Sequence, residues 1–193
     1  QKVINEHLDD DNLKKLATIT TPDALIKIAN SIVHCKPDAV FINTGSVEGV
    51  DWIRQYSLEK GEEQKLAKEG HTIHLDLPQD QARLVNQTFY IINEGERLSS
   101  MAKSLMRDEA TDYVRTYMDG IMKGLTMMIG FYSRGPVGAE ASVPAIEISS
   151  STYVLHSAEL LYRNCYDKFD SEAERMGIFF TNDMNYLGDA ALF

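Results

Sequence analysis

A short stretch of the sequence, from residue 69 to residue 88, gathers side chains that could bind or transfer charge. It contains two histidines, two aspartates and one arginine, which are His71, His74, Asp76, Asp80 and Arg83. A guanidinium group is planar, stays charged and presents a fork of donors that fits a carboxylate or a phosphate. Arg83 is therefore our candidate for binding an anionic group of a substrate.

The two histidines raise the alternative of a metal site. His71 and His74 are three positions apart, and on a helix this spacing would place both on one face. The alternation of Ile73 and Leu75 with polar residues instead predicts a strand over residues 71–75, on which the two rings point to opposite faces. The pattern thus favours polar lining of a cleft over metal coordination. A metal hydrolase stays open as an alternative, with the ligands His71, His74, Asp76 and Asp80.

Two loops elsewhere resemble phosphate-binding loops only in part. Asn43-Thr44-Gly45-Ser46 follows a predicted strand, and Ser46 can cap a helix through Leu58. The loop lacks the GxGxxG and GxxxxGK[ST] patterns, so a plain connection is favoured. Gly135-Pro136-Val137-Gly138 has no lysine after it, and we expect a turn that lets strands and a helix pack.

Alternating helix and strand signals predict the elements that position these residues. Strands are expected at residues 39–42, 71–75, 88–92, 125–132, 142–149 and 178–180. Helices are expected after the Thr20–Asp23 start signal, from Ser46, from Asp108 or Thr111 to Gly124, and after Thr152. The first 20 residues are polar and acidic, which indicates a solvated start or a helix cap. The pattern predicts an α/β fold, a mixed β-sheet flanked by helices.

Composition sets wider limits. The chain has 193 residues, a formal net charge of −10 and two cysteines far apart in sequence, Cys35 and Cys165. Its length suits a single domain over residues 1–193. The acidic surface argues against non-specific binding to nucleic acid or anionic lipid. We see no apolar run long enough to span a membrane and no signal peptide, so we expect a cytoplasmic protein with reduced thiols.

Two ordered blocks of sequence carry a resemblance. The first is Gly70-His-Thr-Ile-His-Leu-Asp76, followed by Asp80-Gln-Ala-Arg83 and Asn86-Gln-Thr88. The second comprises Gly135-Pro-Val-Gly138, Ile146-Glu-Ile148, Ser151-Thr-Tyr-Val154, Ser157 and Arg163. Further matches are Asn43, Gly45, Ser46, Glu48 and Lys123-Gly124. Over residues 20–182 the chain resembles the N-terminal lobe of the GTP-dependent phosphoenolpyruvate carboxykinases, archaeal type.

The resemblance implies both a fold and an activity. The fold would be the N-terminal lobe of the carboxykinase fold. The intact enzyme would be a lyase of gluconeogenesis that converts oxaloacetate and GTP to phosphoenolpyruvate, GDP and carbon dioxide with manganese. Arg83 would contact the carboxylate and phosphate of phosphoenolpyruvate, or the carboxylate of oxaloacetate.

Several motifs of that family do not occur in the sequence. They are the Tyr-Gly-Gly-Asn substrate loop, the lysine, histidine and aspartate ligands of manganese, the Gly-Lys-Thr nucleotide loop and a further arginine. We therefore assign no catalytic, nucleotide-binding or metal-binding residue. We expect the chain to be inactive without a C-terminal nucleotide-binding lobe, because phosphoryl transfer depends on metal ions and several basic groups. A carboxykinase that uses pyrophosphate, or a stand-alone binding module for small dicarboxylates and phosphorylated acids, stays open.

Overall fold

The computed structural model describes residues 2–75 and 88–184. The chain divides into two compact units: unit 1 comprises Gln1–His74 and Gly120–Tyr186, and unit 2 comprises Leu75–Asp119 and Leu187–Phe193. The expectation of a single domain over residues 1–193 stays a prediction. Arg83, together with Asp76 and Asp80, lies outside the described residues.

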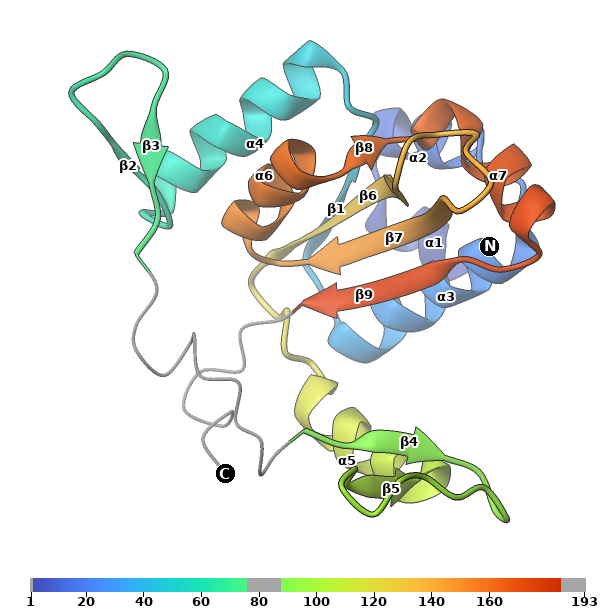
Figure 1. The fold of residues 1–193 in the computed structure, drawn as a ribbon. Coiled ribbons are helices and arrows are strands. Elements are labelled where there is room, and N and C mark those ends of the chain that lie inside the picture. The colour runs from blue at the N-terminus through green and yellow to red at the C-terminus, as the bar shows by residue number, and fades with distance from the viewer. Residues whose placement is uncertain (1, 76–87, 185–193) are drawn as a thin grey trace. The chain divides into compact units, whose positions relative to one another are not determined.

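Unit 1 is built on a five-stranded mixed sheet (Figure 1). Its main path is β1 (Ala39–Asn43), β6 (Thr126–Arg134), β7 (Val143–Ser149) and β9 (Phe180–Met184). The pairs β1–β6 and β7–β9 are parallel, whereas β6–β7 is antiparallel. The short β8 (Arg163–Asn164) pairs with β6 at Tyr132 and Ser133, past the stretch of β6 that pairs with β1. The predicted α/β class with a mixed sheet is confirmed.

The strand β6 is the centre of this sheet. Every residue from Met127 to Ser133 is buried. Met127, Ile129 and Phe131 alternate with Met128 and Tyr132, so apolar groups enter both faces of the sheet. The prediction of a central strand buried on both sides is confirmed, although the strand runs to Arg134, two residues further than expected.

Helices cover both faces of the sheet (Figure 1). The helices α4 (Val47–Glu59) and α6 (Thr152–Leu161) pack side by side on one face. There Ile53 of α4, Leu155 of α6 and Met128 of β6 form one buried apolar cluster. The helix α3 (Pro22–Cys35) lies on the opposite face, with Ile28 and Ile32 fully buried.

Serine side chains cap the two helices on the first face, and the cap at Ser46 was predicted. Ser46 Oγ accepts a hydrogen bond from the Gly49 N–H at 3.1 Å, and Ser151 Oγ accepts one from the Val154 N–H at 3.4 Å. These bonds satisfy donors that the first turn of a helix leaves without a partner. The start of α3 has no hydroxyl cap, because the Thr21 hydroxyl bonds to Asp170.

The acidic N-terminal residues form helices. The helices α1 (Lys2–His7) and α2 (Asp10–Leu16) precede α3, and Asp9 is the cap of α2 through a bond from the Asn12 N–H at 2.8 Å. Asn12 Oδ1 accepts the Ile42 N–H at 2.8 Å, which joins α2 to β1. Both interpretations of the acidic run are confirmed, since Asp9 caps α2 and Asp9, Asp10 and Asp11 are exposed to solvent.

The C-terminal part of unit 1 differs from the prediction. A 3₁₀ turn, η2 (Tyr166–Lys168), leads into the helix α7 (Phe169–Met176), which the sequence patterns did not reveal. Phe169 anchors α7 by packing edge-on against Phe131, with ring centroids 5.0 Å apart. Gly177 ends α7 with φ at +68°, and β9 begins three residues later, at Phe180. The strand predicted at residues 178–180 was therefore placed too early.

Unit 2 contains a parallel strand pair and a helix. The strands are β4 (Tyr90–Ile92) and β5 (Ser104–Met106), and the helix is α5 (Arg107–Met118). The strand expected at 88–92 is thus confirmed in its second half. The helix expected to reach Gly124 stops at Met118, because Asp119 is already extended, with φ at −62° and ψ at 109°, and Gly120 then takes a left-handed φ of +68°. Among the described residues, no helix is long and apolar enough to cross a membrane.

Candidate functional site

The chain approaches Arg83 through a small hairpin of unit 1. Its strands are β2 (Gln64–Lys65) and β3 (Thr72–Ile73), which pair in antiparallel fashion. The strand predicted over residues 71–75 is therefore only two residues long. His74 and Leu75 end the described part of this segment, and Arg83 follows nine positions after His74. The role of Arg83 as a substrate anchor stays a prediction.

Two contacts, a ring stack and a hydrogen bond, hold the His74 ring in place. Its ring stacks on the Tyr153 ring of α6, with centroids 3.6 Å apart and planes 13° apart. Its Nδ1 lies 2.6 Å from the backbone oxygen of Glu62. A carbonyl can only accept, so Nδ1 carries the proton and donates it.

The described residues do not supply a metal site. His71 Nδ1 lies 3.1 Å from its near neighbour, the Glu69 carbonyl oxygen. Within residues 2–75 and 88–184, no group of three or more His, Cys, Asp or Glu side chains could hold a metal ion. These residues therefore do not fit a manganese ion.

Glu62 joins the hairpin to the N-terminus of α6. Its Oε2 accepts the Ser151 hydroxyl at 2.7 Å and the Tyr153 N–H at 3.0 Å, while its Oε1 pairs with Lys60 Nζ at 2.8 Å. Lys60 also donates to the Ser150 carbonyl at 3.0 Å. Partial burial alone would raise the pKa of the Glu62 carboxyl, but the bonds from Lys60, Tyr153 and Ser151 outweigh it and lower the pKa.

Glu63 makes a second, more deeply buried connection. Its carboxylate lies 2.9 Å from His156 Nδ1 of α6 and accepts the Thr72 hydroxyl of β3 at 2.9 Å. Here too burial acts to raise the pKa of the carboxyl, and the bonds from His156 and Thr72 help to bring it below its ordinary value. We call the whole set the hairpin clamp, made of Lys60, Glu62, Glu63, Thr72, His74, Ser151, Tyr153 and His156.

A buried polar cluster lies under α6, at the ends of β1 and β6. One oxygen of Glu159 accepts Asn43 Nδ2 at 2.5 Å, the Tyr132 hydroxyl at 2.9 Å and Asn164 Nδ2 at 3.3 Å. Burial and the neighbouring Glu159 carboxylate both raise the pKa of the Tyr132 hydroxyl far above its ordinary value. Tyr132 therefore stays a neutral donor and is unsuited to act as a base at neutral pH.

The loop from Asn43 to Ser46 uses its polar groups internally. The Gly45 N–H donates to Asn43 Oδ1 at 3.0 Å, and Ser46 Oγ is occupied as the cap of α4. Gly45 has φ at +78°, and a Cβ built on it would lie 2.5 Å from the side chain of Asn164. This arrangement supports the prediction of a plain connection between strand and helix.

The Gly135–Gly138 loop is also held by structural contacts. Glu172 of α7 accepts the Gly138 N–H at 3.2 Å and the Ser142 hydroxyl at 3.3 Å, and it pairs with Arg175 at 2.6 Å. The bond from Arg175 is the main cause that lowers the pKa of the Glu172 carboxyl. The loop is the turn that was predicted, and it positions β7 against α7.

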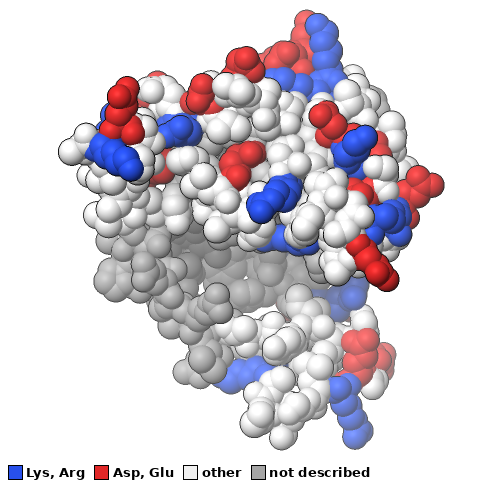
Figure 2. Space-filling model, turned by 45° about the horizontal axis from the view of Figure 1, so that its top comes forward, with Lys and Arg blue, Asp and Glu red and all other residues white. Residues whose placement is uncertain are grey.

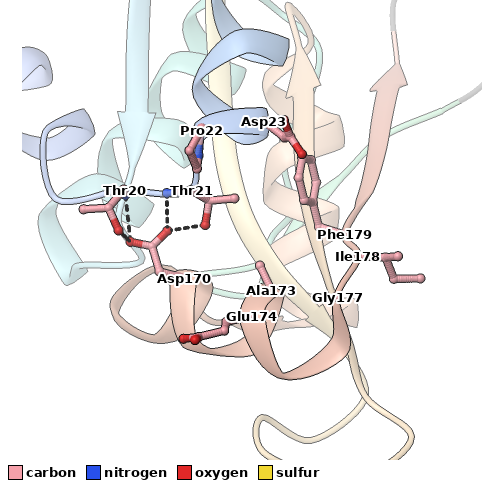
Figure 3. Close-up of a pocket in the computed structure, with 10 residues that line it drawn as sticks. All are labelled: Thr20, Thr21, Pro22, Asp23, Asp170, Ala173, Glu174, Gly177, Ile178 and Phe179. Carbon is pink, nitrogen blue, oxygen red and sulfur yellow. Dashed lines mark hydrogen bonds between the residues drawn. The ribbon is translucent and has the colours of Figure 1, made fainter.

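An open pocket of about 600 Å³ lies where α3 begins and α7 ends (Figure 3). Its polar centre is Asp170, whose two oxygens each accept one N–H and one hydroxyl from Thr20 and Thr21, at 2.6–3.0 Å. Asp23 and Glu174 also line it, and none of its described lining residues is basic. This acidic lining disfavours an anionic ligand, so the pocket does not fit the carboxylate or phosphate that Arg83 is expected to bind.

The charged surface gives no sign of a nucleic-acid interface on the face shown in Figure 2. There Lys and Arg side chains are interspersed with Asp and Glu, and no broad basic patch is visible among the described residues. Proteins that bind a phosphate backbone usually gather basic residues on one face or along one helix.

Sequence reasoning missed most of these polar residues. Tyr153 and Ser151 lie in a quoted block, but nothing local indicated that they contact Glu62, which is about 90 positions earlier. The one usable signal was the pair Glu62-Glu63 directly after a helix end at Gly61, where acidic residues are unfavourable beside the helix's own C-terminus.

Comparison with known proteins shows which family the chain resembles. Residues 27–183 match the family model described as "Phosphoenolpyruvate carboxykinase N-terminal domain". Among curated proteins, the chain is 36% identical over 172 residues to "Phosphoenolpyruvate carboxykinase [GTP]" of Saccharolobus solfataricus, and 34% identical over 168 residues to the protein of the same name from Pyrococcus furiosus. These matches cover 89% and 87% of this chain.

A more distant relative is "Phosphoenolpyruvate carboxykinase, cytosolic [GTP]" of Gallus gallus, 28% identical over 138 residues, with 67% of this chain and 22% of the relative covered. The chain spans 28% of the Saccharolobus solfataricus protein and 27% of the Pyrococcus furiosus protein. The family match covers most of the chain, including all five strands of the unit 1 sheet except the last residue of β9. This chain therefore belongs to the phosphoenolpyruvate carboxykinase N-terminal domain family.

Proposed function

We propose that the chain is the N-terminal part of a GTP-dependent phosphoenolpyruvate carboxykinase. The observation that carries the proposal is the family match over residues 27–183. The names of the longer relatives, which include GTP, favour GTP over pyrophosphate as the phosphoryl donor. The reaction would convert oxaloacetate and GTP to phosphoenolpyruvate, GDP and carbon dioxide, a step of gluconeogenesis.

In this reaction the bond between the leaving carboxylate and the carbon skeleton of oxaloacetate breaks, and its electron pair forms an enolate. The enolate oxygen then takes the terminal phosphoryl group of GTP. Both stages concentrate negative charge, so a fixed cation beside the substrate lowers the barrier. Arg83 is the proposed anchor, since its donor fork fits a planar carboxylate and then a phosphoryl group.

The remaining parts of the catalytic apparatus would come from outside this chain. They are the nucleotide-binding lobe as partner and the ligands of a manganese ion, which would neutralise phosphate charge when bound. The name of the Gallus gallus relative includes "cytosolic", which supports the proposed cytoplasmic location.

The test compares the 193-residue chain with a longer polypeptide that continues through a nucleotide-binding lobe. We expect the longer enzyme to form phosphoenolpyruvate from oxaloacetate with GTP and manganese, and not with pyrophosphate. We expect no turnover by the 193-residue chain. Calorimetry of that chain with oxaloacetate and phosphoenolpyruvate separates the alternatives: sub-millimolar binding would favour a stand-alone binding module, whereas activity with pyrophosphate would change the donor.

A further inference from the structure

The helix α3 packs one side against the sheet (Figure 1) and carries large apolar side chains on its other side as well. On the inner side, Ile28 and Ile32 are fully buried. On the outer side, Ile26 is 57% exposed and Val33 is 55% exposed. At about 100° per residue, Ile26, Asn30 and Val33 lie within about 60° of one another. The outer side of a surface helix is normally polar, so these two apolar residues depart from the usual pattern.

An apolar groove adjoins the outer side of α3. Its volume is about 320 Å³, and all the described side chains that line it are apolar. Leu25, Ile26 and Ala29 form its α3 wall, and side chains from residues 4–19 form the rest. Ile26 belongs both to the groove and to the exposed side of the helix, so the two make one continuous apolar surface. Single exposed apolar residues are ordinary, whereas a continuous apolar surface of this kind is typical of a contact site.

The order of residues along α3 makes this surface complementary to itself. In an antiparallel packing of two copies about a two-fold axis, each residue faces the one that lies equally far from the midpoint on the other copy. With the midpoint between Ala29 and Asn30, Ile26 faces Val33 of the second copy. Because the groove runs beside Ile26, Val33 of the second copy can fill it. The small Ala29 at the midpoint lets the two helix axes approach closely.

The charged residues near the two ends of α3 fit the same arrangement. Asp23 in the first turn and Lys36, the C-cap residue, also lie equally far from the midpoint, so the acidic start of one helix faces the basic end of the other. A parallel pairing would instead bring like charges together. Asn30 lies beside the axis, and a polar residue in an apolar helix interface fixes the register. Charge and shape therefore favour a second copy of this chain as the occupant.

We propose that two copies of this chain form a symmetric dimer through the outer side of α3. This dimer face comprises Asp23, Ile26, Ala29, Asn30, Val33 and Lys36. The contact is one helix wide, which is small for a stable interface, so we expect a reversible dimer with a Kd on the order of 10 µM. The inference goes beyond the proposed function and does not depend on it.

Sedimentation velocity of the 193-residue chain, over concentrations that bracket this Kd, tests the proposal. We expect a monomer–dimer equilibrium in the wild type. Val33→Glu should raise Kd about tenfold or more, because it places a carboxylate in the apolar groove of the second copy. Leu160→Glu is the matched control, since Leu160 is 72% exposed on α6, which packs on the other face of the sheet. Its Kd should stay within about twofold of the wild-type value.

An exchange of charges tests the antiparallel arrangement without removing apolar surface. Asp23→Lys and Lys36→Asp should each weaken self-association by about three- to tenfold, because like charges then face each other. An equimolar mixture of the two variants should form a heterodimer as readily as the wild type forms its dimer, since every facing pair is again opposite in sign. Association of the mixture no stronger than that of either variant alone would overturn the antiparallel arrangement.

Cross-linking of introduced cysteines tests the register. Asn30→Cys places a thiol beside the axis, so mild oxidation should join two copies by a disulfide. Asp23→Cys places a thiol on the same side of α3, but its two copies would lie about 20 Å apart at about 1.5 Å per residue, too far for a disulfide. Both native cysteines, Cys35 and Cys165, are buried and should give little background. Equal rates of cross-linking in the two variants would overturn the register.

The longer polypeptide shows whether the dimer face stays available in the whole protein. We expect the same equilibrium there and the same weakening by Val33→Glu. A 193-residue chain that stays monomeric, or a dimer that Val33→Glu leaves unchanged, would overturn the proposal. A longer polypeptide that does not associate would overturn it too, because another part of the protein then covers α3. Sedimentation measures no turnover, so these results are independent of whether the enzyme makes phosphoenolpyruvate.

Discussion

Replacement of Asp170 by asparagine should weaken the connection between α7 and the start of α3, which are far apart in the sequence. Asp170 near the start of α7 accepts four hydrogen bonds from Thr20 and Thr21, just before Pro22 begins α3 (Figure 3). Partial burial alone would raise the pKa of this carboxyl, but the threonine bonds outweigh it and lower the pKa. The carboxylate thus holds the N-cap residue Thr21 and the residue before it, and it lies near the positive end of the α3 dipole.

The cost can be worked from these contacts. An asparagine keeps one acceptor oxygen and presents an amide donor to the second pair of donors. A threonine hydroxyl can rotate to accept from this amide, but a backbone N–H cannot, so one charge-assisted bond is lost, at roughly 1 kcal/mol net. The lost charge at the helix start adds about 0.5 kcal/mol. The exposure of Thr20, which lets water hydrate the donor that loses its partner, is the reason for the low value of the first loss, and the two losses together give an expected destabilisation of about 1.5 kcal/mol.

The assay is thermal and urea unfolding of the 193-residue chain at pH 7. For a chain of this length, 1.5 kcal/mol corresponds to a decrease in Tm of roughly 3–6 °C. Asp167→Asn is the matched control, since Asp167 is an exposed aspartate three positions earlier, and its Tm should not change. Equal Tm values for wild type and Asp170→Asn would refute the view that this carboxylate joins α7 to α3.

Three further predictions concern Arg83, the loss of stability at low pH and the Gly45 loop. In the longer enzyme, Arg83→Lys should be nearly as damaging as Arg83→Ala, with kcat/KM lowered roughly a hundredfold, because lysine keeps the charge but loses the bidentate fork; steady-state values within about twofold of wild type would remove Arg83 as the anchor. The pKa values of Glu62 and Glu63 are lowered in the folded chain from an ordinary value of 4.5, so their stabilising contribution is complete above that pH and is lost as the pH falls through the lowered values. Tm should therefore be flat from pH 6 to 8 and decrease below about pH 4.5. A Tm that does not change with pH below 4.5 would contradict a stabilising role of these two carboxylates. Gly45→Ala should destabilise unit 1 by about 1–3 kcal/mol in urea unfolding, because φ is positive and Asn164, which its own bonds hold in place, occupies the space of the added Cβ.

The elements that could be predicted are those whose signals are local. The apolar run at 125–132, the serine cap at Ser46 and the start of α3 at Pro22 all depend on neighbours within a few residues, and the structure confirms them. The helix predicted to reach Gly124 was too long because periodic apolar residues continue past Met118, although Gly120 leaves helical geometry there.

The polar contacts that organise unit 1 could not be found in this way. Asp170 contacts Thr20 and Thr21 about 150 positions away, and Glu159 contacts Asn43 across 116 positions. Periodicity and turn signals describe local conformation and carry no information on such pairs. For Arg83 the limit is different: its guanidinium chemistry was evident from the sequence, but the residue lies outside the described part, so its contacts stay predictions.

The pairing of β1 with β6 has a consequence for how the chain folds during synthesis. Ala39 lies opposite Thr126, so 87 residues separate the partners (126 − 39). At about 5–20 residues per second, the ribosome needs ~4–17 s to make the second strand after the first. Hydrophobic collapse of a chain takes at most about 100 µs, which is far shorter than this delay. The apolar side chains Val40 and Ile42, which are buried in the folded chain, therefore lack their partner strand for seconds after synthesis. Protease protection of this strand in stalled nascent chains should appear only after residues 126–134 have left the ribosome, and until then the growing chain must be shielded from association with its copies.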